Sequence, residues 1–88
     1  RVLARADAGV LAIFGAGVQA ELHARAIAHV RTLREIRVLN RTPANAHRLV
    51  ARLADLAPKV IATYDARETL DGADIVCTVT GAGQPILP

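Results

Sequence analysis

An apolar run that breaks at a glycine and continues into a helix of small residues limits most strongly what this chain can fold into. Residues 10–14, Val-Leu-Ala-Ile-Phe, have the length and composition of a buried strand. Gly15 ends this strand, and a helix is expected from Gly17 to Arg31. One narrow face of that helix carries Gly17, Ala20, Ala24 and Ile27, and its small residues let the helix lie close against a sheet. The sequence therefore begins with a strand, a tight turn and a helix.

Short apolar runs alternate with stretches of helical period along the rest of the chain. Further strands are predicted over residues 36–39, 59–62 and 74–79. A second helix starts after Thr42 as N-cap, with Pro43 at its first position, and is closed by Pro58. Its predicted buried side consists of Ala46, Leu49, Val50 and Leu53. Residues 66–70 form a helical turn. This order predicts an α/β fold with a Rossmann-like parallel sheet and helices on both faces.

The amino-acid composition disfavours several classes of function. With 88 residues, 52% hydrophobic and 22% charged, the chain forms at most one globular domain, and we interpret residues 1–88 as an incomplete Rossmann domain whose substrate domain lies elsewhere. The net charge of +3 comes from scattered arginines with two aromatic residues, which disfavours nucleic-acid binding. No apolar stretch approaches the roughly 18 residues that a membrane span needs. A single cysteine, Cys77, lies in an apolar run, so we expect a buried thiol and a reducing, cytoplasmic setting.

The glycine turn predicts an anion site. A strand that ends at Gly15 and a helix that begins at Gly17 bring backbone N–H groups and the positive end of a helix dipole together. Gly15 permits the turn, Gly17 lets a pyrophosphate approach the backbone, and Ala20 allows close packing of helix on strand. The pattern G-x-G-x-x-A in this context indicates a dinucleotide. An ordinary tight turn and a methyl-donor nucleotide site are the alternatives.

The end of the second strand predicts which dinucleotide is bound. NAD-binding domains place a carboxylate there for the ribose 2′-hydroxyl, whereas this chain has Asn40, which would not repel a 2′-phosphate. Arg41 adds a planar cation that binds phosphate, Thr42 adds a hydroxyl at a second helix start, and Asn45 is a further donor. We therefore expect NADP to be preferred, with NAD possible. The alternative is that Asn40 is a turn residue and Arg41 a solvated charge.

The remaining polar residues give weaker indications of a functional site. Thr80 and Gly81 follow the last strand, where ligands of open α/β sheets bind, so they are candidate cofactor contacts. The three histidines have no metal-ligand spacing, and the acidic residues form no catalytic pair, so we expect no metal site and no catalytic residue here.

Three segments together resemble the ornithine cyclodeaminase/mu-crystallin family. They are Gly15-Ala16-Gly17-Val18-Gln19-Ala20 followed by His23, residues 37–42 (Arg-Val-Leu-Asn-Arg-Thr), and residues 72–76 (Gly-Ala-Asp-Ile-Val). Asn-Arg-Thr also occurs in shikimate dehydrogenases and glutamyl-tRNA reductases, whose glycine turns differ. The resemblance implies cofactor contacts from Ala16, Gly17, Val18, Gln19, Asn40, Arg41, Thr42, Asn45, Thr80 and Gly81.

The resemblance also implies a function for the whole protein. Family members move a hydride between a nicotinamide and the α-carbon of a small amino or imino acid, and they are typically homodimers. We therefore expect the cofactor-binding part of an oxidoreductase or cyclodeaminase, inactive without the domain that holds the substrate. The alternative is a non-catalytic, NADPH-dependent ligand-binding protein of the mu-crystallin type.

Overall fold

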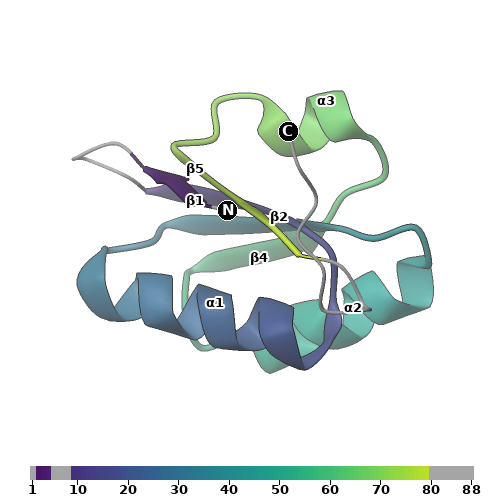
Figure 1. The fold of residues 1–88 in the computed structure, drawn as a ribbon, viewed down its shortest axis with the longest axis horizontal. Helices are drawn as coiled ribbons and strands as arrows, with labels where there is room; N and C mark the ends of the chain where they lie inside the picture. Colours follow the sequence, from purple (N-terminus) through teal and green to yellow (C-terminus); the bar gives the residue numbers. More distant parts are fainter. Residues whose placement is uncertain (1, 5–8, 80–88) are drawn as a thin grey trace.

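The chain forms one five-stranded sheet with helices on both faces (Figure 1). The computed structural model describes residues 2–4 and 9–79. The strands are β1 (Val2–Ala4), β2 (Val10–Phe14), β3 (Glu35–Leu39), β4 (Lys59–Ala62) and β5 (Ile75–Thr78). The helices are α1 (Gly17–Val30), α2 (Pro43–Arg52) and α3 (Ala66–Leu70). The α/β architecture predicted from the sequence is confirmed.

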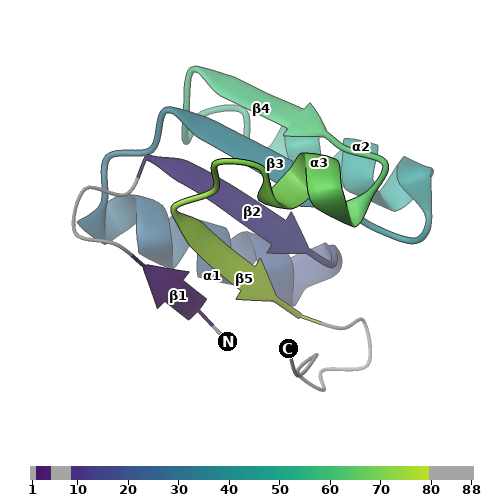
Figure 2. The same cartoon turned by 90° about the horizontal axis from the view of Figure 1, so that it is seen from above.

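The strand order β1-β5-β2-β3-β4 places β2 at the centre (Figure 2). β2, β3, β4 and β5 are parallel, whereas β1 pairs antiparallel with β5 at the edge. The chain winds outward from β2 through β3 to β4 and then returns to the other side of β2 as β5. The strand order therefore reverses between β2 and β5, and ligands of such sheets bind beyond the carboxyl ends of the strands at this point. β1 was not predicted from the sequence.

The core lies between the sheet and the helices α1 and α2. In the parallel register Leu11 lies beside Ile36 and Ile75, and Ile13 lies beside Val38 and Cys77. All six side chains are at most 1% exposed. The helices cover this layer with Ala20 and Ala24 from α1 and with Ala46, Leu49 and Leu53 from the α2 segment. The predicted core positions Ala20, Ala24, Ala46, Leu49 and Leu53 are confirmed, whereas Ile27 and Val50 are only partly buried. Gly17, predicted on the same face of α1, is exposed at the start of the helix. Burial raises the pKa of the Cys77 thiol.

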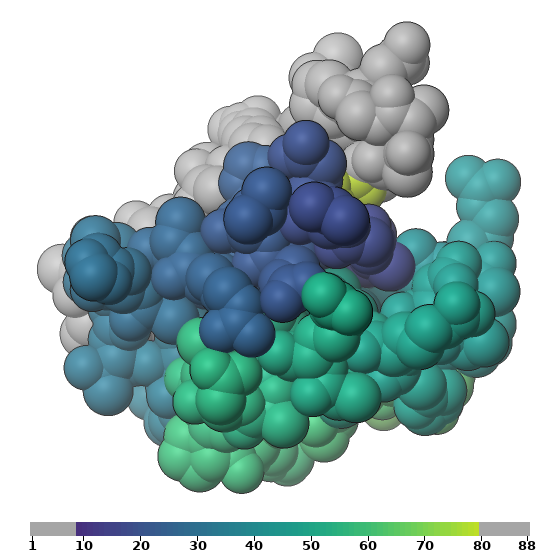
Figure 3. Space-filling model, turned by 90° about the horizontal axis from the view of Figure 1, so that it is seen from below, coloured from purple at the N-terminus to yellow at the C-terminus, as the bar shows by residue number. Residues whose placement is uncertain are grey.

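Viewed from the side of these helices, α1 and α2 lie next to each other over the sheet (Figure 3). α2 ends at Arg52, earlier than the break predicted at Pro58. The Arg25 guanidinium donates to the Arg52 carbonyl oxygen at 2.8 Å and satisfies one of the helix's terminal acceptors. A contact with α1 therefore accompanies the end of α2, and no local breaker residue is needed.

The opposite face of the sheet carries α3 (Figure 1). The Asp65 side chain accepts a hydrogen bond from the Glu68 N–H at 2.7 Å, and the Glu68 side chain accepts one from the Tyr64 N–H at 2.9 Å. The pair is a variant of the capping box, in which Glu68 reaches the N–H one residue before the N-cap Asp65, and it fixes the start of the helix. At the other end, Arg37 from β3 donates to the carbonyl oxygens of Thr69 and Asp71. Both ends of this short helix are thus bound by side chains.

Gly15 lies at the reversal point between β2 and β5, where no other residue fits. Its φ is +136°, and a Cβ on it would lie 2.3 Å from the Val79 carbonyl oxygen. The Val79 N–H donates to the Phe14 carbonyl oxygen at 2.9 Å, and the Gly15 N–H donates to that of Leu39 at 2.9 Å. The turn that leaves β2 is therefore bonded to the strands on both sides of it.

We expect Gly15→Ala to lower the free energy of unfolding by about 3 kcal/mol or more, because it combines an unfavourable φ with a backbone clash. Gly72→Ala is the matched control, since Gly72 has a φ of +71° but open space around a Cβ. Gly72→Ala should lower the free energy of unfolding by only about 1 kcal/mol, because only the unfavourable backbone conformation contributes. Urea denaturation of both variants measures the difference, and equal losses would contradict this account of Gly15.

Candidate functional site

The first turn of α1 is open to solvent. Its N-cap residue is Ala16, which has an extended backbone and no side-chain capping bond. Gly17, Val18 and Gln19 are exposed, and a Cβ on Gly17, whose φ is +88°, would meet nothing within 4 Å. The N–H groups of a first helical turn have no partner within their own helix and attract anions. The turn therefore offers backbone donors and room for an anionic group, which are the features that a pyrophosphate requires.

The segment after β3 is held in a side-chain turn. The Asn40 Oδ1 accepts a hydrogen bond from the Thr42 N–H at 2.8 Å, an Asx-turn that leads into Pro43 at the start of α2. Thr42 occupies the N-cap position, as predicted, but its hydroxyl makes no capping bond. The Asn40 oxygen is thus bonded within the turn, and the Asn40 Nδ2 offers two donor hydrogens to a ligand.

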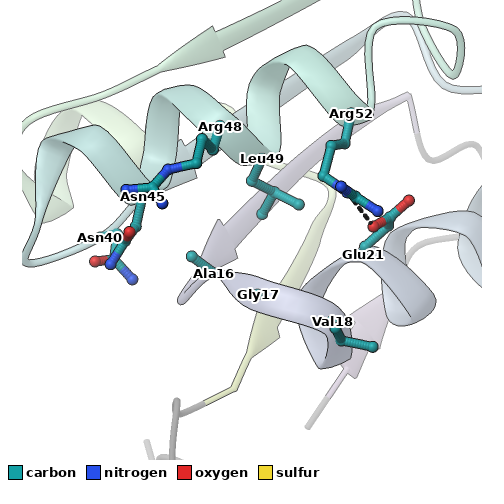
Figure 4. Close-up of a pocket in the computed structure, with 9 residues that line it drawn as sticks. All are labelled: Ala16, Gly17, Val18, Glu21, Asn40, Asn45, Arg48, Leu49 and Arg52. Atoms are coloured by element: carbon teal, nitrogen blue, oxygen red, sulfur yellow. Dashed lines mark hydrogen bonds and ion pairs between the residues drawn. The ribbon is translucent and has the colours of Figure 1, made fainter.

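A pocket of about 400 Å³ lies between the start of α1 and α2 (Figure 4). Its lining consists of Ala16, Gly17, Val18, Glu21, Asn40, Asn45, Arg48, Leu49 and Arg52. Leu49 forms an apolar part of the lining between two polar ends. Asn40, Asn45 and Arg48 lie at one end, and Glu21 and Arg52 lie at the other. The pocket thus joins the exposed helix start to polar side chains of α2 and of the β3 end.

The structure brings five of the predicted cofactor residues together in this pocket: Ala16, Gly17, Val18, Asn40 and Asn45. Gly15 is partly buried behind them, and Gln19, Arg41 and Thr42 are exposed outside the lining. Thr80 and Gly81 lie outside the described residues. Three lining residues were not predicted from the sequence: Glu21, Arg48 and Arg52. Helical spacing contained the signal for the two arginines, because positions three and seven after Asn45 share its helix face.

Charged side chains link α1 to α2 beside the pocket. The Arg52 Nε binds Glu21 at 2.7 Å, and the Arg25 Nε binds the same carboxylate at 3.2 Å. Arg25 also binds Asp55, with 3.1 Å between Nη1 and Oδ2. Hydrogen bonds from Arg52 and then Arg25 hold the pKa of Glu21 below its ordinary value, and Arg25 does the same for the pKa of Asp55. Glu21 therefore stays ionised and is matched by cations.

Other kinds of site find no support in the described part of the chain. Residues 2–4 and 9–79 contain no group of three or more His, Cys, Asp or Glu side chains placed to hold a metal ion. Within the same residues, no helix is long and apolar enough to cross a membrane. His47 lies apart from the pocket lining, with its Nε2 3.2 Å from the Tyr64 hydroxyl. The pocket at the start of α1 remains the candidate functional site.

Comparisons with known proteins point to one family. The family model described as the ornithine cyclodeaminase/mu-crystallin family matches residues 1–88. An uncharacterized cyclodeaminase of Sinorhizobium fredii is 43% identical over 86 residues, which are 97% of this chain and 26% of that protein. A glutamyl-tRNA reductase of Halobacterium salinarum is 42% identical over 94% of this chain and 18% of its own length. The ketimine reductase mu-crystallin of Mus musculus is 37% identical over 89% of this chain and 24% of its own length.

A solved structure extends the likeness to the fold. The Δ1-pyrroline-2-carboxylate reductase of Thermococcus litoralis, solved in complex with NADH and L-proline, superposes with a TM-score of 0.81 at 32% identity. The match covers 89% of this chain and 24% of that one. The chain thus spans about a quarter of the length of its cyclodeaminase and ketimine reductase relatives.

We expect Glu21→Gln to lower the melting temperature at pH 7, with an effect that shrinks as the pH falls through the folded pKa of this carboxyl, which lies below its ordinary value of 4.5. Because the folded pKa is depressed, ionised Glu21 stabilises the fold above that value, and the contribution is lost as the pH falls through the folded pKa. Thermal unfolding followed by circular dichroism at pH 7 and at pH ~2 measures this decrease.

Asp71→Asn is the matched control, since that carboxylate is exposed and makes no side-chain hydrogen bond within the described residues. It should change the melting temperature little at either pH. A loss in Glu21→Gln that is equally large at both pH values would show that the carboxylate does not act through its charge.

Proposed function

We propose that this chain, which belongs to the ornithine cyclodeaminase/mu-crystallin family, binds the pyrophosphate of a nicotinamide dinucleotide at the start of α1. The observation that carries the proposal is the uncapped, exposed first turn of α1, where Gly17 leaves open space beside a 400 Å³ pocket. The similar reductase of Thermococcus litoralis is a complex with NADH, which supports a dinucleotide. Backbone N–H groups of Ala16, Gly17, Val18 and Gln19 are the proposed ligands, with Gly15 shaping the turn.

NADP is the dinucleotide that we propose as preferred, with NAD as a weaker ligand. The Asx-turn leaves the Asn40 amide as a donor at the position where NAD-binding domains carry a carboxylate. A 2′-phosphate carries only acceptor oxygens, so donors from Asn40, Arg41, Thr42 and Asn45 suit it. Thr80 and Gly81 complete the proposed contacts beyond β5.

The complete protein is proposed to act on a small amino or imino acid. Relatives named as a cyclodeaminase and as a ketimine reductase support this substrate class, as does the solved reductase with L-proline. The cofactor, when bound, supplies or accepts a hydride at the α-carbon of the substrate. This chain orients the dinucleotide, and a further domain holds the substrate carboxylate and delivers the proton. We also propose a homodimer, as the family implies, in the cytoplasm, which suits the unpaired Cys77 thiol.

Gly17→Ala should raise the Kd for both NADPH and NADH by about tenfold or more, because the added methyl group occupies the space that the pyrophosphate requires. Gly72→Ala, which has a similar left-handed backbone far from the pocket, should leave both values unchanged. Titration followed by nucleotide fluorescence measures these constants. Undiminished binding by Gly17→Ala would remove the pyrophosphate from this turn.

The complete protein, expressed from the whole reading frame that contains this chain, should oxidise NADPH when given a cyclic imino acid such as Δ1-pyrroline-2-carboxylate. The 88 residues alone should bind nucleotide without turnover, because the proton-delivering groups lie outside them. The loss of NADPH absorbance measures both reactions. Imine reduction by the 88-residue chain would refute this division of roles.

A further inference from the structure

The pocket contains a cation that neither the sequence motif nor the family resemblance marks. Asn45, Arg48 and Arg52 follow one face of α2, and all three line the pocket. Figure 4 shows the Arg48 side chain running toward Asn45, at the end of the pocket that also holds Asn40. Arg52 lies at the other end and is bonded to Glu21.

The two arginines differ in how their charge is balanced. The Arg52 Nε lies 2.7 Å from a Glu21 carboxylate oxygen, so its charge is matched. Within residues 2–4 and 9–79, the Arg48 guanidinium makes no hydrogen bond and no ion pair with another side chain. In the described pocket Arg48 is therefore the cation without a carboxylate partner, and an anionic ligand would supply one.

The neighbours of Arg48 fit the same kind of ligand. Asn40 presents its Nδ2 because its oxygen accepts from the Thr42 N–H. The Asn45 amide lies beside it and carries two further donor hydrogens. Arg41, the cation expected from the sequence to bind phosphate, is exposed outside the pocket lining. This end of the pocket lining is thus rich in donors, and the exposed Arg48 side chain adds one positive charge without a carboxylate partner.

We propose that Arg48, as part of the pocket lining, binds the 2′-phosphate of the adenosine ribose and determines the preference for the phosphorylated dinucleotide. This inference rests on the proposed function, since it assigns a residue to one subsite of the proposed NADP site. Arg41, which lies outside the pocket lining, would contact the same phosphate as a second cation. Two arginines bind a phosphate more selectively than one does, because charge-assisted hydrogen bonds add geometric specificity.

The test replaces Arg48 by Gln, which removes the charge and retains a long side chain suited to a helix. In the complete protein Arg48→Gln should raise the Kd for NADPH by about tenfold and that for NADH by less than about threefold. Adenosine 2′,5′-bisphosphate and adenosine 5′-diphosphate, used as competitors, isolate the phosphate subsite from the nicotinamide. Arg48→Gln should bind adenosine 2′,5′-bisphosphate more weakly, and its affinity for adenosine 5′-diphosphate should stay nearly unchanged.

Two further variants are the controls. Arg48→Lys should retain part of the NADPH preference, because it retains the charge but not the planar fork. Arg67→Gln removes an exposed arginine from α3, on the other face of the sheet, and should change no affinity. Circular dichroism of each variant checks that the fold is intact.

The possible outcomes separate this inference from the proposed function. Equal weakening of NADPH and NADH in Arg48→Gln would place Arg48 against the adenosine and overturn the inference. Unchanged NADPH binding would overturn it as well, with the dinucleotide site intact. If the unsubstituted protein binds neither nucleotide, the proposed function itself fails.

Discussion

The close approach of Gly15 to Val79 is the constraint on which the rest of the structure depends. The two residues meet at the carboxyl ends of β2 and β5, where the strand order reverses. A Cβ added to Gly15 would lie only 2.3 Å from the Val79 carbonyl oxygen. Because β5 passes so near, the chain leaving β2 turns away from it with a positive φ and enters α1 at Gly17. The direction of that turn exposes the first N–H groups of α1, so the packing of the sheet and the exposure of the anion site have the same cause.

The end of β3 contributes in a different way, through side-chain hydrogen bonding. Asn40 fixes the following turn by accepting from the Thr42 N–H, and Pro43 then begins α2. The Asn40 oxygen is used for structure, and its nitrogen remains for a ligand. One residue thus positions α2, which carries Asn45 and Arg48 to the pocket, and also makes this end of the pocket a donor of hydrogen bonds. A carboxylate at position 40 could fix the same turn, but its charge would repel a phosphate.

The sequence predicted the parts of the molecule that local pattern determines. Residues 10–14, the start of α1 at Gly17 and the start of α2 at Pro43 follow from apolar runs, glycine and proline, all of which act within a few residues. β1 was missed because three residues carry little pattern and its partner β5 lies far along the chain. Arg48 was missed because a pocket exists only once α1 and α2 have packed together. Helical spacing places Arg48 and Arg52 on the helix face of Asn45, but only the packing of α1 against α2 makes that face part of a pocket.

The electrostatics of the pocket depend on the pair formed by Glu21 and Arg52. A carboxylate that lines a phosphate site would weaken binding by repulsion, and Glu21 lines this pocket. Hydrogen bonds from Arg52 and Arg25 hold it ionised and surround its charge with two cations. The bond from Arg52 also links α2 to α1. The same interaction therefore balances the charge of Glu21 and holds the two helices together beside the pocket. With Glu21 balanced in this way, the charge of Arg48 at the other end is not cancelled by the carboxylate of the pocket and is available to an anion.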